Sequence, residues 1–529
     1  MASGKTDIFD FMTAAVSNFN AVETIADLLR IEGFTELRES DFCWNVQPGG
    51  RHFVIKNDSA IFAFIAGEEP AASPFRLIAA HSDSPGFRLK PNPEMPVGAC
   101  SGGADLMVKL NVEKYGGVIL SSWMDRPLGL CGRVIVCPDF DFPLELESRI
   151  VRLDEPRLVI PRLAIHFNRA VNEGVPLSVQ KDMLPILGYV SKTLGGKDAV
   201  RNLLANHLEI DPEQIIDFDI TLYDLQGPER IGADSSWINC GRLDDLAMAW
   251  CAIQALLEAG EGENTRVAAI FDNEETGSAT RQGAHSPVLR NILRRIAAEA
   301  TDEQFLALLA RSFFISADCA HAAHPNYLEK MDPVNLPRLG AGPVIKVNAN
   351  CKYMTDALSA ARFKQICAMV DVPVQEFVNH SDSPGGSTLG NILTSTLDID
   401  GVDMGIALWS MHSARENGLT DRHCPHHPRL LRRPLISHTP MQPPIYEIEN
   451  RLGEAVSLPV PRRKPGDRYD PYGIASLGEA TFWRRHNPLR CSIWRGGFRF
   501  AALSEAMTKP LPGYSCASES HIMNLYYDN

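Results

Sequence analysis

The chain has 529 residues, which is too long for one compact core and favours several domains or one large domain with an insertion. Hydrophobic residues make up 45% and charged residues 22%, a globular balance that excludes a wholly disordered chain. The net charge of -14 argues against nucleic acid as the main partner, because phosphate binding depends on clustered cations.

Targeting signals are absent from the sequence pattern. The first residues show no basic region followed by an apolar run, so no secretory signal is expected. No stretch reaches the roughly 18 to 20 uninterrupted apolar residues that a membrane span needs. The 12 cysteines include no C-x-x-C pair, which favours reduced thiols. These observations predict a cytoplasmic protein without a membrane partner.

The first part of the chain alternates between helical and strand patterns. Apolar residues recur at helical spacing over residues 8–31, which predicts an amphipathic helix. Apolar runs typical of strands follow at 53–55, 60–65 and 76–80. Three prolines within residues 91–98 then predict a break and a domain boundary.

Short β-type runs dominate the next segment. Residues 117–120 and 132–137 are examples within about 100–230. A helical pattern returns at 243–257, and an apolar strand is expected at 267–271. This order predicts an α/β domain that is interrupted by a mainly β insertion.

Residues 417–529 differ from the rest in composition. They carry a net charge of +5 and 13 of the 36 prolines, whereas residues 1–416 carry -19. Proline removes a backbone donor and fixes φ, so this tail is expected to be irregular. Two interpretations stay open: a disordered basic tail that serves a partner, or an aberrant coding end.

Acidic and histidine residues follow several of the expected strands. His81 and Asp83 come directly after one strand, at a spacing that gives one metal ligand and one carboxylate to orient its imidazole. Asp244 or Asp245 at the start of a helix is a second candidate ligand. An adjacent pair, Glu274 and Glu275, follows the strand at 267–271. One of the two could bind a metal while the other serves as general base.

Two more such motifs lie further along the chain. Asp318 ends an apolar strand, with His321 close behind, and His412 ends another apolar run. Open α/β sheets place their sites at the carboxyl ends of strands, so these side chains are expected to meet. Two histidines with Asp and Glu suit zinc, cobalt or manganese.

These motifs, in this order, resemble those of aspartyl aminopeptidase, in the M18 family of dinuclear zinc metallopeptidases. The resemblance covers residues 1–416 and rests on five motifs: His81-Ser-Asp, Arg242-Leu-Asp, Asp272-Asn-Glu-Glu, Ser316-Ala-Asp-x-Ala-His321 and Met411-His-Ser-x-Arg-Glu416. It implies release of N-terminal Asp or Glu from peptides by water that two zinc ions activate, with Co²⁺ or Mn²⁺ as alternatives.

The resemblance also implies a role for each site residue. The metal ligands would be His81, Asp244, Glu275, Asp318 and His412, with Asp244 shared by both ions. Glu274 would be the catalytic base, and Asp83 would hold His81. The substrate-binding residues would be His166, His321, Lys346 and Tyr353, with His166 reaching into a neighbouring subunit.

A fold and an assembly follow from the same resemblance. A three-layer zinc-peptidase-like α/β domain would comprise residues 1–92 and 236–416, with a β-rich dimerisation domain inserted at 93–235. The subunits would form a homo-dodecamer built from dimers.

Two departures keep alternatives open. Asp245 stands where the family usually has Asn, and the chain after residue 416 does not resemble the family's closing helix. The alternatives are a non-catalytic assembly or binding protein crippled by its altered C-terminus, and a dinuclear aminopeptidase of other specificity.

Overall fold

The computed structural model describes residues 7–99, 105–191, 198–369 and 372–419. Residues 420–529, nearly all of the tail expected to be irregular, lie outside the described residues, so the irregularity of the tail stays a prediction.

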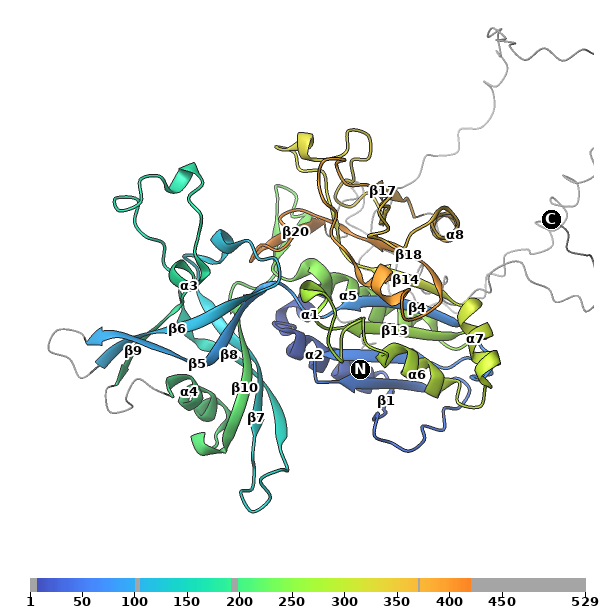
Figure 1. Ribbon diagram of the computed structural model, residues 1–529, viewed down its shortest axis with the longest axis horizontal. Coiled ribbons are helices and arrows are strands. Elements are labelled where there is room, and N and C mark those ends of the chain that lie inside the picture. Colours follow the sequence, from blue (N-terminus) through green and yellow to red (C-terminus); the bar gives the residue numbers. More distant parts are fainter. Residues whose placement is uncertain (1–6, 100–104, 192–197, 370–371, 420–529) are drawn as a thin grey trace, which may run out of the picture. The chain divides into compact units, whose positions relative to one another are not determined.

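The larger sheet has nine strands (Figure 1). In spatial order these are β1 (Thr35–Glu36), β2 (Arg51–Lys56), β3 (Ala60–Ile65), β13 (Thr265–Phe271), β4 (Phe75–His81), β14 (Phe313–Ala317), β18 (Asp400–Gly405), β16 (Val344–Lys346) and β17 (Gln375–Phe377). The central strands β13, β4, β14 and β18 run parallel to one another. Their carboxyl ends therefore share one edge of the sheet.

Helices cover both faces of this sheet. Along β4, Leu77 and Ala79 join one buried hydrophobic cluster, and Ile78 and Ala80 join the other, as strand alternation requires. On the face of the sheet that carries Ile78 and Ala80, the cluster includes residues of helices α1 (Ile8–Ala14), α2 (Asn18–Ile31), α5 (Leu243–Ala259) and α8 (Ala357–Ala368). On the opposite face, which carries Leu77 and Ala79, the cluster includes residues of α6 (Val288–Ile296), α7 (Asp302–Ala310) and α9 (Leu389–Leu393). The predicted three-layer α/β fold is confirmed.

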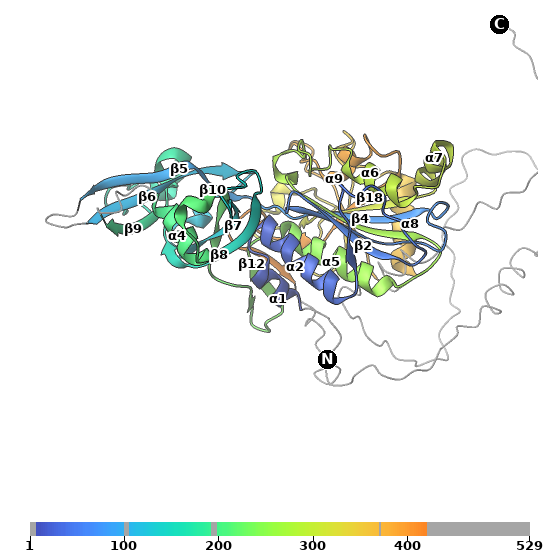
Figure 2. The same ribbon diagram turned by 90° about the horizontal axis from the view of Figure 1, so that it is seen from below.

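A second, six-stranded sheet is antiparallel throughout (Figure 2). Its order is β8 (Glu147–Leu158), β7 (Leu128–Val136), β10 (Ile215–Asp224), β5 (Gly86–Ala99), β6 (Asp105–Tyr115) and β9 (Ile186–Ser191). Residues of this sheet and of helices α3 (Val179–Asp182) and α4 (Ala199–Leu208) share a hydrophobic core of their own. This β-rich part lies between β4 and β13 in the sequence, as an insertion does.

Two smaller sheets complete the described strands. One joins β11 (Glu229–Ile231), β12 (Trp237–Cys240) and β20 (Glu416–Leu419); the other pairs β15 (Ala320–His321) with β19 (Ala407–Leu408). Strand β20 runs three residues past residue 416, where the predicted catalytic domain ends, so residues 417–419 are not irregular. None of the helices within the described ranges has the length and apolar character that a membrane crossing requires.

The N-terminal helix prediction was wrong in one respect. Residues 8–31 form two helices, because the Ser17 side chain accepts a hydrogen bond from the Asn20 amide and caps a new helix start. The predicted break at 91–98 was also wrong, because β5 runs through it. The strand shifts register against β6 after Leu89, and beyond Arg88 it has no pairing with β10. Prolines are tolerated at such irregular edges.

Residues 117–120 do not form the strand that their β-branched residues favour. Gly116 adopts a positive φ of 66°, which turns the chain out of β6, and a 3₁₀ helix begins at Leu120. The amide of Ile119 donates to the carbonyl oxygen of His412 at 3.0 Å. A contact with a distant residue thus replaces strand pairing in this segment.

Candidate metal centre and active site

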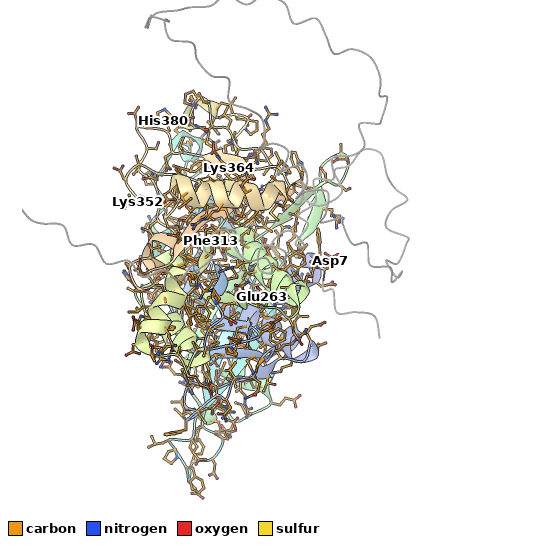
Figure 3. All side chains as sticks on the ribbon, turned by 90° about the vertical axis from the view of Figure 1, so that its right-hand side faces the viewer. Asp7, Glu263, Phe313, Lys352, Lys364 and His380 are labelled. Atoms are coloured by element: carbon orange, nitrogen blue, oxygen red, sulfur yellow. The ribbon has the colours of Figure 1, made fainter. Side chains whose placement is uncertain are left out.

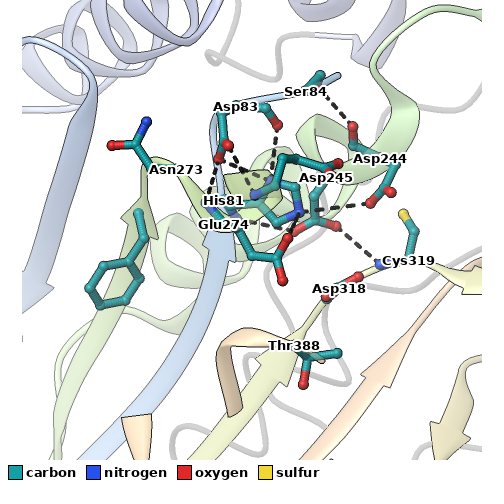
Figure 4. Close-up of polar contacts among 12 residues, drawn as sticks. His81, Asp83, Ser84, Asp244, Asp245, Asn273, Glu274, Asp318, Cys319 and Thr388 are labelled. Atoms are coloured by element: carbon teal, nitrogen blue, oxygen red, sulfur yellow. Dashed lines mark hydrogen bonds and ion pairs between the residues drawn. The ribbon is translucent and has the colours of Figure 1, made fainter. Parts of the chain in front are cut away.

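Three of the predicted ligands, His81, Asp244 and Asp318, lie close together at one edge of the nine-stranded sheet (Figure 4). His81 ends β4, Glu274 and Glu275 follow its parallel neighbour β13, and Asp318 follows its other neighbour β14. Asp244 comes from the start of α5, which packs against the sheet. The strand ends therefore converge as the sequence predicted.

Three overlapping groups of side chains have the geometry to hold metal ions. Within each group the potential ligand atoms all lie within 4.8 Å of one another. The groups are His81 with Asp244, Asp245 and Asp318; His81 with Glu274 and Glu275; and Asp244 with Glu275 and His412. Asp244 belongs to two of the groups, which places its carboxylate between the two histidines.

Both histidines present Nε2 to the carboxylates. The Nδ1 of His81 lies 2.9 Å from the Asp83 carbonyl oxygen, and that of His412 lies 3.1 Å from the Gly117 carbonyl oxygen. A carbonyl oxygen only accepts, so each Nδ1 carries the hydrogen and each Nε2 is left as the ligand atom. The Nε2 atoms lie 3.8 Å and 3.3 Å from the Asp244 carboxylate oxygens.

Excess buried negative charge marks this cluster. Burial opposes protonation of His412, but contacts with Asp244 and Glu275 outweigh it and raise the His412 pKa to about 11. Burial raises the pKa of Glu275 to about 7, although His412 counteracts it. Burial likewise raises the pKa of Glu274 well above its ordinary value. Among the described residues, such carboxylates have too few positive partners to balance their charge.

The donor set fits a divalent cation of the zinc type. The buried Oδ1 of Asp244 has no hydrogen-bond partner among the described residues, which is costly unless another group binds it. Imidazole nitrogens mixed with carboxylate oxygens are the ligands that zinc, cobalt and manganese accept.

Comparison with known proteins identifies the family. A model of the family described as aminopeptidase I zinc metalloprotease (M18) matches residues 11–424. The chain belongs to the M18 family. It is therefore related to metal-dependent aminopeptidases, which are hydrolases.

Curated relatives agree with this assignment. A probable M18 family aminopeptidase 2 of Clostridium novyi is 44% identical over 421 residues, which cover 79% of this chain and 95% of that protein. A protein of the same description from Pseudomonas aeruginosa is 39% identical over 414 residues, covering 77% and 92%.

Solved structures of M18 proteins share the fold. A chain of the cryo-EM structure of the Ape4 and Nbr1 complex is 35% identical, with a TM-score of 0.73 over 78% of this chain and 82% of that one. The M18 aminopeptidase of Thermotoga maritima is 25% identical, with a TM-score of 0.65 over 78% and 91%. The S. cerevisiae mApe1 dodecamer is 25% identical, with a TM-score of 0.66 over 78% and 91%.

Three carboxylates beside the candidate metal centre each accept hydrogen bonds from two backbone amides of the segments that carry the predicted ligands, and we call each such carboxylate a clamp. Asp83 accepts hydrogen bonds from the amides of both Glu274 and Glu275, each at 3.1 Å. Asp245 accepts from the amides of His81 at 3.1 Å and of Cys319, the neighbour of Asp318, at 3.2 Å.

Glu416 is the third of these carboxylates. Its Oε1 accepts from the His412 amide at 2.7 Å, and its Oε2 accepts from the Asp244 amide at 2.9 Å. The residue is buried, and burial together with the charge of Asp244 raises its pKa to about 8. Sequence reasoning assigned Glu416 no role, because only the fold brings Asp244 beside it.

Of the predicted substrate-binding residues, Lys346 and Tyr353 lie beside the cluster. The Lys346 Nζ lies 3.0 Å from Asp318 Oδ1, and 5.8 Å from the centre of the Tyr353 ring. The lysine is buried; burial lowers its pKa, but the charge of Asp318 and other neighbours outweighs this and raises it. The structure therefore pairs Lys346 with a predicted metal ligand.

The other two predicted substrate-binding residues are exposed. His321 ends β15, and its ring centre lies 5.8 Å from that of Phe377. His166 lies in the segment between β8 and β9 and belongs to none of the three metal-binding groups of the described residues. A contribution of His166 to a neighbouring subunit's site stays a prediction.

The clamp formed by Glu416 generates a stability prediction. Replacing Glu416→Gln keeps the shape but exchanges one acceptor oxygen for a donor, so one buried amide loses its partner. At a pH above the Glu416 pKa of about 8, where the side chain is a carboxylate, we expect the free energy of unfolding to fall by about 1–3 kcal/mol, seen as a lower midpoint in urea for metal-free protein. The exposed Glu145→Gln is the matched control and should stay within about 0.5 kcal/mol. Equal midpoints for E416Q and wild type would contradict the clamp.

Proposed function

We propose that this M18 chain releases N-terminal Asp and Glu from peptides with two Zn²⁺ ions per subunit. The observation that carries the proposal is the position of Asp244, which belongs to one ligand group with His81 and to another with His412. A carboxylate shared by two ligand groups is what a two-metal site requires. Co²⁺ or Mn²⁺ would suit the same donors.

The proposed ligands divide between the two sites. His81 and Asp318 would hold one ion, Glu275 and His412 would hold the other, and Asp244 would serve both. When bound, the ions supply Lewis-acid polarisation of the scissile carbonyl and a lowered pKa of water. Asp83 would keep His81 oriented through the short contact of its backbone carbonyl with Nδ1.

Glu274 is proposed as the general base. Its Oε2 lies 4.0 Å from His81 Nε2, and it belongs to none of the groups that include Asp244. Its amide is fixed by Asp83, so the carboxylate is held beside the ligand cluster. From there it would accept a proton from the attacking water and deliver it to the leaving amine.

Lys346 is the proposed source of acidic specificity, together with Tyr353 and His321 as neighbouring substrate contacts. An ammonium group has three donors, and one of them reaches Asp318, so Lys346 retains donors for a substrate carboxylate. The same ion pair is the observation that favours an aminopeptidase of other specificity, because Asp318 already neutralises the lysine.

The proposed assembly is a homo-oligomer, a dodecamer built from dimers. A dodecameric relative, mApe1, shares the fold. The segment around His166 exposes Leu163, Ile165 and Phe167, which favours burial of this segment against another subunit. His166 would then complete the neighbouring subunit's substrate site.

Metal removal tests the proposed reaction. We expect purified full-length protein to hydrolyse Asp- and Glu-terminated chromogenic substrates, to lose this activity to a chelator and to regain it with zinc. The rates on Leu- and Lys-terminated substrates are measured for comparison and are expected to be lower. Preference for Leu or Lys would contradict the acidic specificity, and a zinc-loaded protein that cleaves none of the four would contradict catalysis.

Removal of the proposed base should separate chemistry from metal binding. Glu274→Gln preserves size but cannot accept the proton, so we expect kcat to fall about 10²- to 10⁴-fold. Zinc affinity, measured by chelator competition, should stay close to wild type because Glu274 is not a proposed ligand. The exposed Glu329→Gln is the control. A variant with wild-type kcat would exclude Glu274 as base.

Loss of the Lys346 charge tests specificity. A charge-assisted hydrogen bond is worth about 1.5–3 kcal/mol, so Lys346→Met should lower the ratio of kcat/KM for Asp- over Asn-terminated substrates roughly 10- to 100-fold. A general loss of activity, caused by leaving Asp318 without its Lys346 partner, would lower kcat/KM for both substrates and leave this ratio unchanged. Lys364→Met, on the outer helix α8 (Figure 3), is the control for charge loss. An unchanged ratio for K346M would assign the preference to another residue.

A further inference from the structure

One short segment of the second sheet contacts the candidate metal centre. Tyr115 ends β6, and Gly116 and Gly117 follow it out of the sheet. We propose that residues 115–117 form a positioning segment that holds both predicted histidine ligands, His81 through Asp83 and His412 directly. The proposal rests on the metal-binding part of the proposed function, and it assigns to the β-rich part a task within its own subunit.

The contact with the His81 side passes through Asp83. The Tyr115 hydroxyl donates to Asp83 Oδ2 at 2.7 Å, while the Asn273 side-chain amide donates to the same hydroxyl oxygen at 2.9 Å. Because Asn273 supplies a hydrogen to that oxygen, the hydroxyl hydrogen is directed to Asp83. Asp83 Oδ1 in turn lies 3.4 Å from His81 Nδ1.

Asp83 thus receives hydrogen bonds from two parts of the molecule. The amides of Glu274 and Glu275 reach it from the nine-stranded sheet, and Tyr115 reaches it from the six-stranded sheet. Asp83 is buried, so each donor lowers the cost of keeping its carboxylate charged. Without the tyrosine donor, Asp83 Oδ2 would keep the hydrogen bond from the Glu275 amide but lose the one from Tyr115. The carboxylate would then be less firmly oriented.

The contact with the His412 side is made by the backbone. The carbonyl oxygen of Gly117 accepts the His412 Nδ1 hydrogen at 3.1 Å, which selects Nε2 for the metal. A Cβ at position 117 would lie 3.2 Å from that same Nδ1. At position 116, φ is positive and a Cβ would lie 3.2 Å from the Cβ of Glu275. A side chain at either position would therefore have to displace its neighbour by a few tenths of an ångström, and at position 116 the positive φ also favours glycine.

Removal of one hydroxyl tests the His81 side. In Tyr115→Phe the ring stays and the donor to Asp83 is lost, so we expect zinc affinity to fall about 10- to 100-fold. The measurement is competition between full-length protein and a chromophoric chelator for Zn²⁺. The absorption spectrum of the Co²⁺ form should change as well. Tyr223→Phe, which removes a buried hydroxyl of the same sheet that contacts Asp154, should change neither readout.

A second variant tests the His412 side independently. Gly117→Ala crowds His412 Nδ1 and should also weaken zinc binding, whereas Gly227→Ala, where a Cβ meets nothing within 4 Å, should not. If Tyr115→Phe does not fold, the comparison of Gly117→Ala with Gly227→Ala still tests the proposal at His412. Kinetics on an Asp-terminated substrate should show the loss in kcat rather than KM.

Two results would overturn the proposal. One is wild-type zinc affinity and an unchanged Co²⁺ spectrum in Tyr115→Phe or Gly117→Ala. The other is a lowered urea midpoint with unchanged zinc affinity, which would assign the segment a structural role only. A wild-type protein that binds zinc but cleaves no substrate would contradict the proposed function alone, because the affinity comparison does not depend on catalysis.

Discussion

The arrangement of this site depends on carboxylates that bind backbone amides. Asp83, Asp245 and Glu416 each accept hydrogen bonds from two amides, and these amides belong to segments that contribute the metal-binding groups. Buried carboxylates repel one another, so a cluster of acidic ligands tends to open unless its backbone is held. A hydrogen bond from a backbone N–H group supplies that hold without adding a cation that would compete with the metal.

The clamps also link elements that are distant in the sequence. Glu416 connects the start of α5 to the loop of His412, and Asp245 connects the end of β4 to the residue after Asp318. Each of these two clamps therefore holds two predicted ligands from different elements at a fixed distance from one another. Metal affinity depends on such distances, since a ligand group that is already assembled need not be ordered when the ion binds.

The convergence of these side chains could be predicted from sequence because most of the predicted ligands follow apolar strands. His81 and Asp318 end such runs, and Glu274 and Glu275 come directly after another, so parallel pairing alone brings them together. Glu416 and Tyr115 could not be assigned in this way, because their partners are set by packing between elements. Residues 117–120 show the same limit: their β-branched residues favour a strand, but contacts with His412 decide their conformation. Three prolines failed to end β5 because one side of the strand is unpaired there.

The β-rich insertion also reaches the candidate metal centre. Within the protomer, its Tyr115 hydroxyl and Gly117 carbonyl contact groups that orient both histidines. The exposed segment of His166 belongs to the same insertion, and its proposed place is in a neighbouring subunit. The two segments are connected through one sheet, because Tyr115 ends β6 and the segment of His166 leads toward β9, which pairs with β6. Without the insertion the chain would retain every proposed ligand, but Asp83 would lose its hydrogen bond from the Tyr115 hydroxyl and His412 would lose its contact with the Gly117 carbonyl oxygen.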